Sequence, residues 1–148
     1  MAFWQLFYHL VWATKQRRPL LTPQIELSVF SYLQLQAEKK GCVVLAVNGY
    51  LDHVHMVVSI PPTVALTEVI QQVKGATSHK FPELRWQDGY GALTVGRRNL
   101  ELAIAYVRRQ KEHHADQTAL KWLEQCEEES HNVREEQALY EAGDEYLF

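Results

Sequence analysis

Residues 52–60 read Asp-His-Val-His-Met-Val-Val-Ser-Ile, an apolar run with two histidines near its start. The β-branched and aliphatic residues predict a strand. Because side chains alternate along a strand, His53 and His55 share one face, while Val54 and Met56 point to the opposite face. Two adjacent imidazoles can hold one divalent metal or one phosphate, or they can be ordinary solvent-facing strand residues. The rest of the chain has to decide between these alternatives.

A second strand precedes this one. Residues 42–47 are almost continuously apolar, which predicts a central strand paired on both edges. Asn48-Gly49 then opens a tight connection to the His53 strand, so the two strands are expected to form a hairpin.

The remaining periodic segments complete an α+β fold. Strands are expected at 6–14 and 92–95, and amphipathic helices at 23–40, after a Thr22 cap, and from 66 to about 79. The order βαββαβ is that of a ferredoxin-like sandwich with an antiparallel sheet. Both helices must cover one face of this sheet, so the other face is expected to be free for a ligand.

Further helices are expected beyond this core, which spans about 6–95. One runs over about 97–112, and the other, capped by Asp116, runs over about 116–128. With them, residues 1–128 form a single domain of ordinary size. Residues 129–148 lack a clear periodic pattern and are expected to be an acidic C-terminal tail.

Charge is divided unevenly along the chain. Residues 1–123 hold 14 Lys and Arg against 9 Asp and Glu, whereas 124–148 hold one Arg against 9 acids. A basic body is compatible with a phosphate-backbone partner, and the acidic end is either a solvated terminus or an electrostatic cover over a basic groove. The candidate nucleic-acid contacts are Lys15, Arg17, Arg18, Arg97, Arg98, Arg108, Arg109 and Lys111.

The composition points to no membrane or secretory context. No apolar run approaches the roughly 20 residues that span a bilayer, so no membrane partner is expected. The two cysteines, Cys42 and Cys126, do not make a disulfide framework. A cytoplasmic location is the default expectation.

The helix expected at 97–112 carries another pair of chemically useful residues. Tyr106 and Gln110 are four residues apart and share one face. Taken alone, Tyr106 is compatible with a packed aromatic and Gln110 with a solvated polar residue. His113-His114 follow directly; they either approach a phosphate or metal or, as we favour, form a histidine pair stabilised by the helix dipole.

Three motifs occur together in a fixed order. They are Asp52-His53-Val54-His55 on a strand, Trp86-Gln87-x-Gly89-Tyr90-Gly91 before a strand, and Tyr106-x-x-x-Gln110 on a later helix. In this set the chain resembles the single-tyrosine HUH transposases of the smallest bacterial insertion sequences and their repeat-associated relatives. The resemblance covers about residues 7–123, and the acidic tail exceeds what the family pattern leads us to expect.

The resemblance implies a role for each residue. His53 and His55 would be two imidazole ligands of a divalent metal, Mg²⁺ or Mn²⁺, and Gln110 would be the third ligand. Tyr106 would attack a DNA phosphorus, leaving a 5′-phosphotyrosine and a 3′-OH. Because a phosphotyrosine diester conserves the energy of the broken bond, no nucleotide cofactor is expected. Asp52 is either a partner that orients His53 or simply a turn residue.

The resemblance also implies partners. Members of this family act on single-stranded DNA, recognise hairpins near the element ends and commonly work as homodimers. Gly96 precedes the Tyr106 helix and permits the backbone to swing. We therefore expect a shared site, with His53 and His55 from one chain and Tyr106 and Gln110 from the other.

Two other functions stay open. One is a non-catalytic module that binds single-stranded nucleic acid by stacking bases on Trp4, Phe7, Tyr8 or Trp12. Such a module has no need of Tyr106 and Gln110 in register, which argues against it. The other is an HUH replication-initiator nuclease, which shares the chemistry and differs in biological context.

Overall fold

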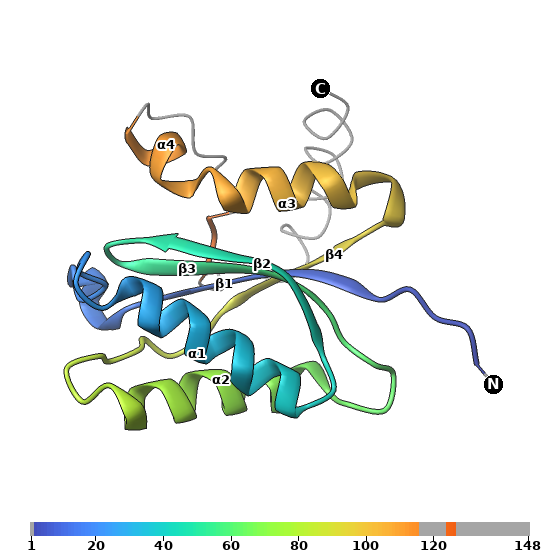
Figure 1. Cartoon of the computed structure of the whole chain (residues 1–148), viewed down its shortest axis with the longest axis horizontal. Coiled ribbons are helices and arrows are strands. Elements are labelled where there is room, and N and C mark those ends of the chain that lie inside the picture. Colours follow the sequence, from blue (N-terminus) through green and yellow to red (C-terminus); the bar gives the residue numbers. More distant parts are fainter. Residues whose placement is uncertain (1, 116–123, 127–148) are drawn as a thin grey trace.

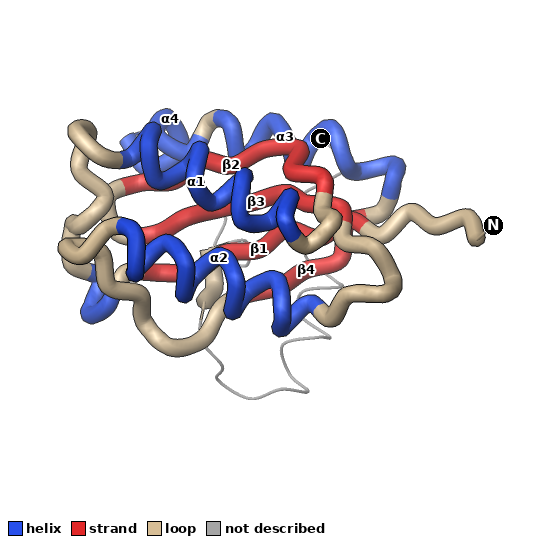
Figure 2. The backbone as a smooth tube through the Cα atoms, turned by 60° about the horizontal axis from the view of Figure 1, so that its bottom comes forward, coloured by secondary structure: helices blue, strands red, loops and turns tan. Residues whose placement is uncertain are grey.

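A four-stranded antiparallel sheet supports the other elements of the fold (Figures 1 and 2). The computed structural model describes residues 2–115 and 124–126. The strands lie in the order β2-β3-β1-β4, so β3 and β1 are the central strands. Their bounds are Phe7–Ala13 for β1, Val43–Tyr50 for β2, His53–Ser59 for β3 and Gly91–Val95 for β4. With α1 (Glu26–Lys39) and α2 (Leu66–Lys80), the chain has the predicted βαββαβ order.

Helices α1 and α2 cover one face of the sheet and enclose the main core (Figure 1). Alternate residues of the central strands point into this core, including Leu10 and Trp12 of β1 and Val54 and Met56 of β3, all fully buried. The apolar stripes of the helices meet them there; their buried members are Val29, Phe30, Leu33, Ala37, Val69, Ile70 and Val73. The predicted alternation along residues 53–60 is confirmed.

The segment after β4 forms three short helical pieces. They are the 3₁₀ turn η2 (Arg97–Asn99), α3 (Leu100–Arg108) and α4 (Gln110–Ala115). The single helix expected at 97–112 therefore breaks at Arg109, whose backbone N–H bonds the carbonyls of both Ala105 and Tyr106. The break lets α4 change direction while its first residue stays close to the end of α3.

Helices α3 and α4 lie over the second face of the sheet, above β2 and β3 (Figure 1). The prediction that this face is free was wrong. Helix α3 is amphipathic, and its Ala103 and Val107 bury against Ala46 and Val57 of the sheet in a second apolar cluster. An apolar helix stripe of this kind has to be covered, and the open sheet face is what covers it.

The β2–β3 hairpin differs from the prediction in two ways. Strand β2 is an edge strand, not a central one. It continues through Asn48 and Gly49, and Leu51-Asp52 make the turn. The Asn48 amide donates to the Arg108 carbonyl at 3.0 Å, and a Cβ at Gly49 would meet the backbone of His53. The Asn-Gly pair thus serves packing onto α3 and β3, and not the turn.

Helix α1 also begins later than predicted. Residues 23–25 form a turn, in which the Thr22 carbonyl accepts hydrogen bonds from the N–H groups of Ile25 and Glu26. The Thr22 side chain makes no cap, so the predicted helix start at Pro23 was wrong. Between β1 and this turn, Lys15–Arg17 form the 3₁₀ turn η1.

The chain returns to the second sheet face at residues 124–126. These residues are not helical, so the helix expected at 116–128 is wrong there. The rest of that helix and the acidic 129–148 lie outside the described residues. Cys126 is buried against Val11 and Ala13 of β1, and the Gln125 carbonyl lies over Gly91 of β4. Among the described helices, none has the length and apolar character needed to cross a membrane.

Candidate active site

His53 and His55 lie side by side on the sheet face that α3 and α4 cover. Their exposed fractions are 2% and 0%, so they are not solvent-facing strand residues. Their ring centroids are 5.0 Å apart in an edge-to-face arrangement. Two buried imidazoles at this spacing need polar partners, because burying an unpaired polar group is costly.

Asp52 supplies the partner for His53. The Nδ1 of His53 donates to Asp52 Oδ1 at 2.7 Å, and an Arg17 nitrogen lies 3.7 Å from the other Asp52 oxygen. Burial lowers the pKa of His53, but hydrogen bonds to the carboxylates of Asp52 and Glu124 outweigh it and raise that pKa to about 9. The hydrogen bond with His53 in turn lowers the pKa of Asp52. Asp52 is thus both a turn residue and the group that directs His53 Nε2 into the site.

His9 of β1 supplies the partner for His55. Its Nε2 lies 2.8 Å from His55 Nδ1, and both rings are buried. Burial lowers the pKa of His55 to about 4 and that of His9 well below its ordinary value, so both rings are neutral at pH 7. Among the described residues, His9 Nδ1 has no hydrogen-bond partner. Sequence reasoning missed His9, although alternation along β1 places it on this face once β1 and β3 are neighbours.

Helices α3 and α4 bring Tyr106 and Gln110 to the two histidines. Gln110 Oε1 lies 3.3 Å from His53 Nε2, and the Tyr106 ring centroid lies 6.0 Å from that of His55. Both side chains are buried, and the Gln110 amide donates to the Tyr106 carbonyl at 3.4 Å. The four residues singled out from the motif therefore meet in one place, although the helix breaks between Tyr106 and Gln110.

These four residues come from one chain. In the shared site expected from Gly96, α3 would leave β2 and β3 of its own chain and pack on those of a partner. Gly96 itself has open space around it, since a Cβ added there would meet no heavy atom within 4 Å. Within a single chain the four residues form a self-contained arrangement, and the shared arrangement stays a prediction.

Glu124 stands at the centre of the site, and sequence reasoning did not single it out. Its Oε2 lies 2.6 Å from His55 Nε2 and 3.1 Å from His53 Nε2. Its Oε1 accepts a hydrogen bond from the Tyr106 hydroxyl at 2.7 Å. Burial raises the pKa of this carboxyl, but hydrogen bonds from the two histidines outweigh it and hold the pKa well below its usual range. One carboxylate thus contacts both imidazoles and the phenol.

The histidine pair of α4 borders this site. The His113 ring stacks on Tyr106 with centroids 4.5 Å apart, and the His114 ring stacks on Tyr50 at 4.9 Å. The Nε2 of His114 lies 3.4 Å from Glu124 Oε1. Burial lowers the pKa of His114. The helix dipole, which we favoured from the sequence, does not account for these contacts.

The donor set fits a divalent metal. His53, His55 and Glu124 each offer one ligand atom, and these atoms lie within 4.8 Å of one another. The amide oxygen of Gln110 adjoins them. Each imidazole has a partner on Nδ1 that directs Nε2 inward, as ligand histidines generally do. Imidazole together with oxygen donors suits ions such as Mn²⁺, and oxygen donors are those that Mg²⁺ prefers.

Comparison with known proteins assigns this site to a family. The family model described as "Transposase IS200 like" matches residues 2–110, which include both histidines of β3 as well as Tyr106 and Gln110. The chain belongs to the IS200-like transposase family. It is therefore a DNA transposase, with the α+β fold of that family.

Individual relatives agree with this assignment. The ISDra2 transposase TnpA of Deinococcus radiodurans is 27% identical over 119 residues, covering 72% of this chain and 85% of the relative. The transposase for insertion sequence element IS200 of Salmonella typhimurium is 29% identical over 121 residues, covering 74% and 79%.

Solved structures share the fold. The crystal structure of a candidate transposase from Deinococcus radiodurans matches with a TM-score of 0.61 at 25% identity, covering 74% of this chain and 93% of that one. A REP-associated tyrosine transposase bound to a REP hairpin matches with a TM-score of 0.58 at 13% identity, covering 77% and 74%.

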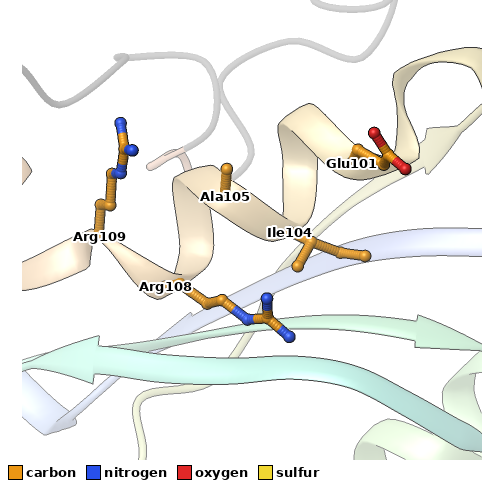
Figure 3. Close-up of a pocket in the computed structure, with 5 residues that line it drawn as sticks. All are labelled: Glu101, Ile104, Ala105, Arg108 and Arg109. Atoms are coloured by element: carbon orange, nitrogen blue, oxygen red, sulfur yellow. The ribbon is translucent and has the colours of Figure 1, made fainter.

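The candidate DNA contacts of this IS200-like transposase lie in different places around the site. Arg17 of η1 approaches Asp52, and Lys111 of α4 forms an ion pair with Glu26 at 3.2 Å. Arg108 and Arg109 line a pocket on α3, where Arg108 extends toward the sheet and Arg109 away from it (Figure 3). The others are Lys15 and Arg18 at η1 and Arg97 and Arg98 at η2, all exposed.

The stacking platforms considered from the sequence are mostly unavailable in this transposase. Trp12 is fully buried in the main core, so its place among them was wrong. Tyr8 and Phe7 pack against the two apolar clusters, and Trp4 is 38% exposed. Since α3 covers the sheet face that would carry bases, a binding module that stacks bases on the sheet finds no support here.

Proposed function

We propose that this transposase cleaves and rejoins single-stranded DNA with Tyr106 as the nucleophile and with His53, His55 and Gln110 as metal ligands. The observation that carries the proposal is the position of the phenol oxygen. The carboxylate of Glu124 contacts the Tyr106 hydroxyl at 2.7 Å through one oxygen. Its other oxygen lies 2.6 Å from His55 Nε2 and 3.1 Å from His53 Nε2. A nucleophile and a ligand set this close are what a metal-assisted attack on one phosphate requires.

The reaction follows from the chemistry of a phenol. A phenol in water has a pKa of about 10, so at neutral pH it is a weak nucleophile that needs assistance. Its oxygen attacks phosphorus and forms an O–P bond, while the bond from phosphorus to the 3′ oxygen breaks and leaves the electron pair on that oxygen. The phenol releases its proton, and the 3′ oxygen takes one up. The products are a 5′-phosphotyrosine and a 3′-OH, and attack by a 3′-OH reverses the step without a nucleotide cofactor.

The residues of the chain divide the remaining work. A bound divalent metal would withdraw charge from the phosphate and stabilise the transition state. Asp52 and His9 keep the two imidazoles oriented, while His113 stacks on the Tyr106 ring and limits its rotation. Helix α3, buried along Ala103 and Val107, fixes the height of the phenol above the sheet.

The proposed substrate is single-stranded DNA with hairpins near the ends of a mobile element, bound by a homodimer. The basic residues around η1, η2 and α3 support a phosphate-backbone partner. The structural relative bound to a REP hairpin supports hairpin recognition.

Cleavage of labelled element-end DNA tests this function. Single-stranded DNA labelled on its 3′ side is incubated with Mn²⁺, and adducts that survive denaturation are counted. We expect the label to stay on the protein, and His53→Ala to lower the yield about 100-fold or more by removing a metal ligand. Hairpin binding should change little, because it rests on the basic residues. His79→Ala, exposed on α2, is the matched control. Undiminished cleavage by the His53 variant, or in EDTA, would contradict the metal assignment.

A further inference from the structure

We propose that Glu124 is a carboxylate ligand of the metal and that it also positions the Tyr106 hydroxyl. This inference rests on the proposed function, because it takes the centre at His53 and His55 to be a metal site. Glu124 lies beyond the residues that the family model matches, which end at 110. The family model therefore does not account for this residue.

The geometry of the carboxylate is that of a shared ligand. Its Oε2 lies 2.6 Å from His55 Nε2 and 3.1 Å from His53 Nε2. Ligand atoms that bind one small divalent cation at about 2.1 Å lie roughly 3 Å from one another. The distances from Glu124 Oε2 to the two imidazole nitrogens lie on either side of this roughly 3 Å separation. Gln110 Oε1, 3.3 Å from His53 Nε2, extends the same ring of donors.

The chemistry of the donor set favours the same assignment. Two imidazoles and an amide form a neutral set with one oxygen, whereas Mg²⁺ and Mn²⁺ prefer oxygen donors and bind anionic ones best. Among the described residues, His53, His55 and Glu124 are the group whose ligand atoms converge. Glu124 adds an anionic oxygen and brings the donors to two nitrogens and two oxygens.

The segment that carries Glu124, residues 124–126, is packed against the sheet. Cys126, two residues away, is 6% exposed and packs against Val11 and Ala13. The Gln125 carbonyl lies close over Gly91, where any side chain would collide with it. Glu124 itself is 16% exposed. These contacts hold the segment against the central strand β1 and edge strand β4.

The second carboxylate oxygen of Glu124 accepts a hydrogen bond from the proposed nucleophile, the Tyr106 hydroxyl. Glu124 Oε1 accepts the Tyr106 hydroxyl at 2.7 Å, while the His113 ring stacks on one side of the phenol and the His9 ring meets it edge-on at 6.2 Å. A single side chain thus connects the metal ligands to the attacking oxygen. Positioning of this kind raises the rate of attack without changing how tightly DNA binds.

Binding of Mn²⁺ alone tests the ligand role. The metal is titrated into the full chain without DNA, and the free ion is followed by electron paramagnetic resonance. We expect Glu124→Gln to weaken binding about tenfold or more, and His53→Ala to weaken it at least as much. Glu112→Gln removes the same charge from an exposed position on α4 and should bind like wild type. Equal or tighter binding by Glu124→Gln overturns the ligand role.

Single-turnover adduct formation tests the positioning role. With Mn²⁺ raised until each variant is saturated, we expect Glu124→Gln to form the phosphotyrosine adduct about tenfold or more slowly, with unchanged affinity for hairpin DNA. A rate equal to wild type overturns the positioning role. A faster rate, together with tighter metal binding, would mean that Glu124 blocks the site, and this also overturns the proposal.

The controls separate this proposal from the one on which it rests. If wild type neither binds Mn²⁺ nor forms an adduct, the proposed function fails. If wild type does both and Glu124→Gln matches it, only the present inference fails. Unfolding of the variants in EDTA is checked by circular dichroism. Should Glu124→Gln not fold, Glu124→Asp, whose shorter side chain cannot span both contacts, is measured in its place with the same expectations.

Discussion

At the scale of single residues, the two imidazoles of β3 are held by unlike partners. His53 donates to a carboxylate, whereas His55 meets the neutral ring of His9. The consequence is a pKa of about 9 for His53 and of about 4 for His55, although the rings are neighbours on one strand face. Without a bound metal, a positive charge at neutral pH therefore resides on His53, between the carboxylates of Asp52 and Glu124.

This charge predicts a pH dependence of stability in EDTA. The pKa of His53 in the fold, about 9, exceeds the ordinary 6.5. Its contribution is therefore complete below pH 6.5 and is lost as the pH rises through 9. Asp52→Asn removes one of the hydrogen bonds that raise this pKa. We expect the fall in unfolding free energy between pH 6.5 and 9 to shrink by roughly 1–3 kcal/mol in the variant.

Urea unfolding at pH 6.5 and 9 measures this difference. Glu83→Gln, which removes an exposed acid between α2 and β4, should keep the wild-type dependence. Parallel curves for wild type and Asp52→Asn would contradict the assigned hydrogen bond. His55 acts in the opposite sense: its pKa is lowered, so its contribution is present above pH 6.5 and is lost as the pH falls through 4.

The residues of the site differ in how far the sequence could predict them. His53 and His55 are two residues apart on a predicted strand, and Tyr106 and Gln110 are four apart on a predicted helix, so local spacing was enough to pair them. Glu124 lies 69 residues from His55, in a segment that the sequence predicted to be helical and that is not helical at 124–126. Its role depends on a long-range return of the chain, which spacing alone does not encode.

At the scale of elements, the site lies between the sheet and its second cover, α3 with α4 and residues 124–126. The docking of 124–126 depends on Gly91, because a Cβ there would meet the Gln125 carbonyl and the Val11 side chain. We expect Gly91→Ala to push this segment outward. Cys126, now buried, should then react with a thiol reagent about tenfold or more faster, as expected when local opening becomes easier.

The reaction of Cys126 is followed by mass spectrometry of modified peptides, with buried Cys42 as an internal reference. Gly75→Ala is the matched control, since no heavy atom lies within 4 Å of its Cβ position on α2. If Cys126 reacts as slowly in Gly91→Ala as in wild type, the packing of 124–126 on β4 is contradicted.

The elements themselves followed from periodicity where it was strong. A run of β-branched and aliphatic residues placed β3, and apolar stripes at helical spacing placed α1 and α2. The packing of α3 on the second sheet face was not predicted, although its apolar stripe could be seen in the sequence. Periodicity shows that such a stripe must be buried, but it does not show which surface buries it. The prediction of a turn at Asn48-Gly49 was wrong for a related reason, because packing against α3 and β3 outweighed the turn preference of the Asn-Gly pair.

At the scale of the whole molecule, the question is whether one chain suffices for cleavage. Here Tyr106 meets the histidines of its own chain, and its helix buries Ala103 and Val107 against the sheet. A reciprocal exchange of this helix between two chains would bury the same apolar surface, because the partner's helix would take its place. One chain nevertheless brings the phenol and both histidines together, so the structure agrees with a self-contained site.

Complementation decides between the two arrangements. His53→Ala and Tyr106→Phe chains, each with its own affinity tag, are co-expressed, and mixed dimers are isolated through both tags. A self-contained site predicts that mixed dimers stay inactive, because each chain lacks one essential group. The shared site that Gly96 suggests predicts that one of the two sites is complete and that cleavage returns to about half of wild type.

The most direct measurement is the identity of the residue that becomes covalently joined to DNA. Wild type is incubated with single-stranded element-end DNA and Mn²⁺, the adduct is digested, and the modified peptide is sequenced by mass spectrometry. We predict a phosphotyrosine at Tyr106 and no adduct in Tyr106→Phe, a change that removes one oxygen and keeps the ring packed on His113. An adduct that persists in this variant, or that maps to Tyr50 or Tyr90, would contradict the assignment of Tyr106 as the nucleophile.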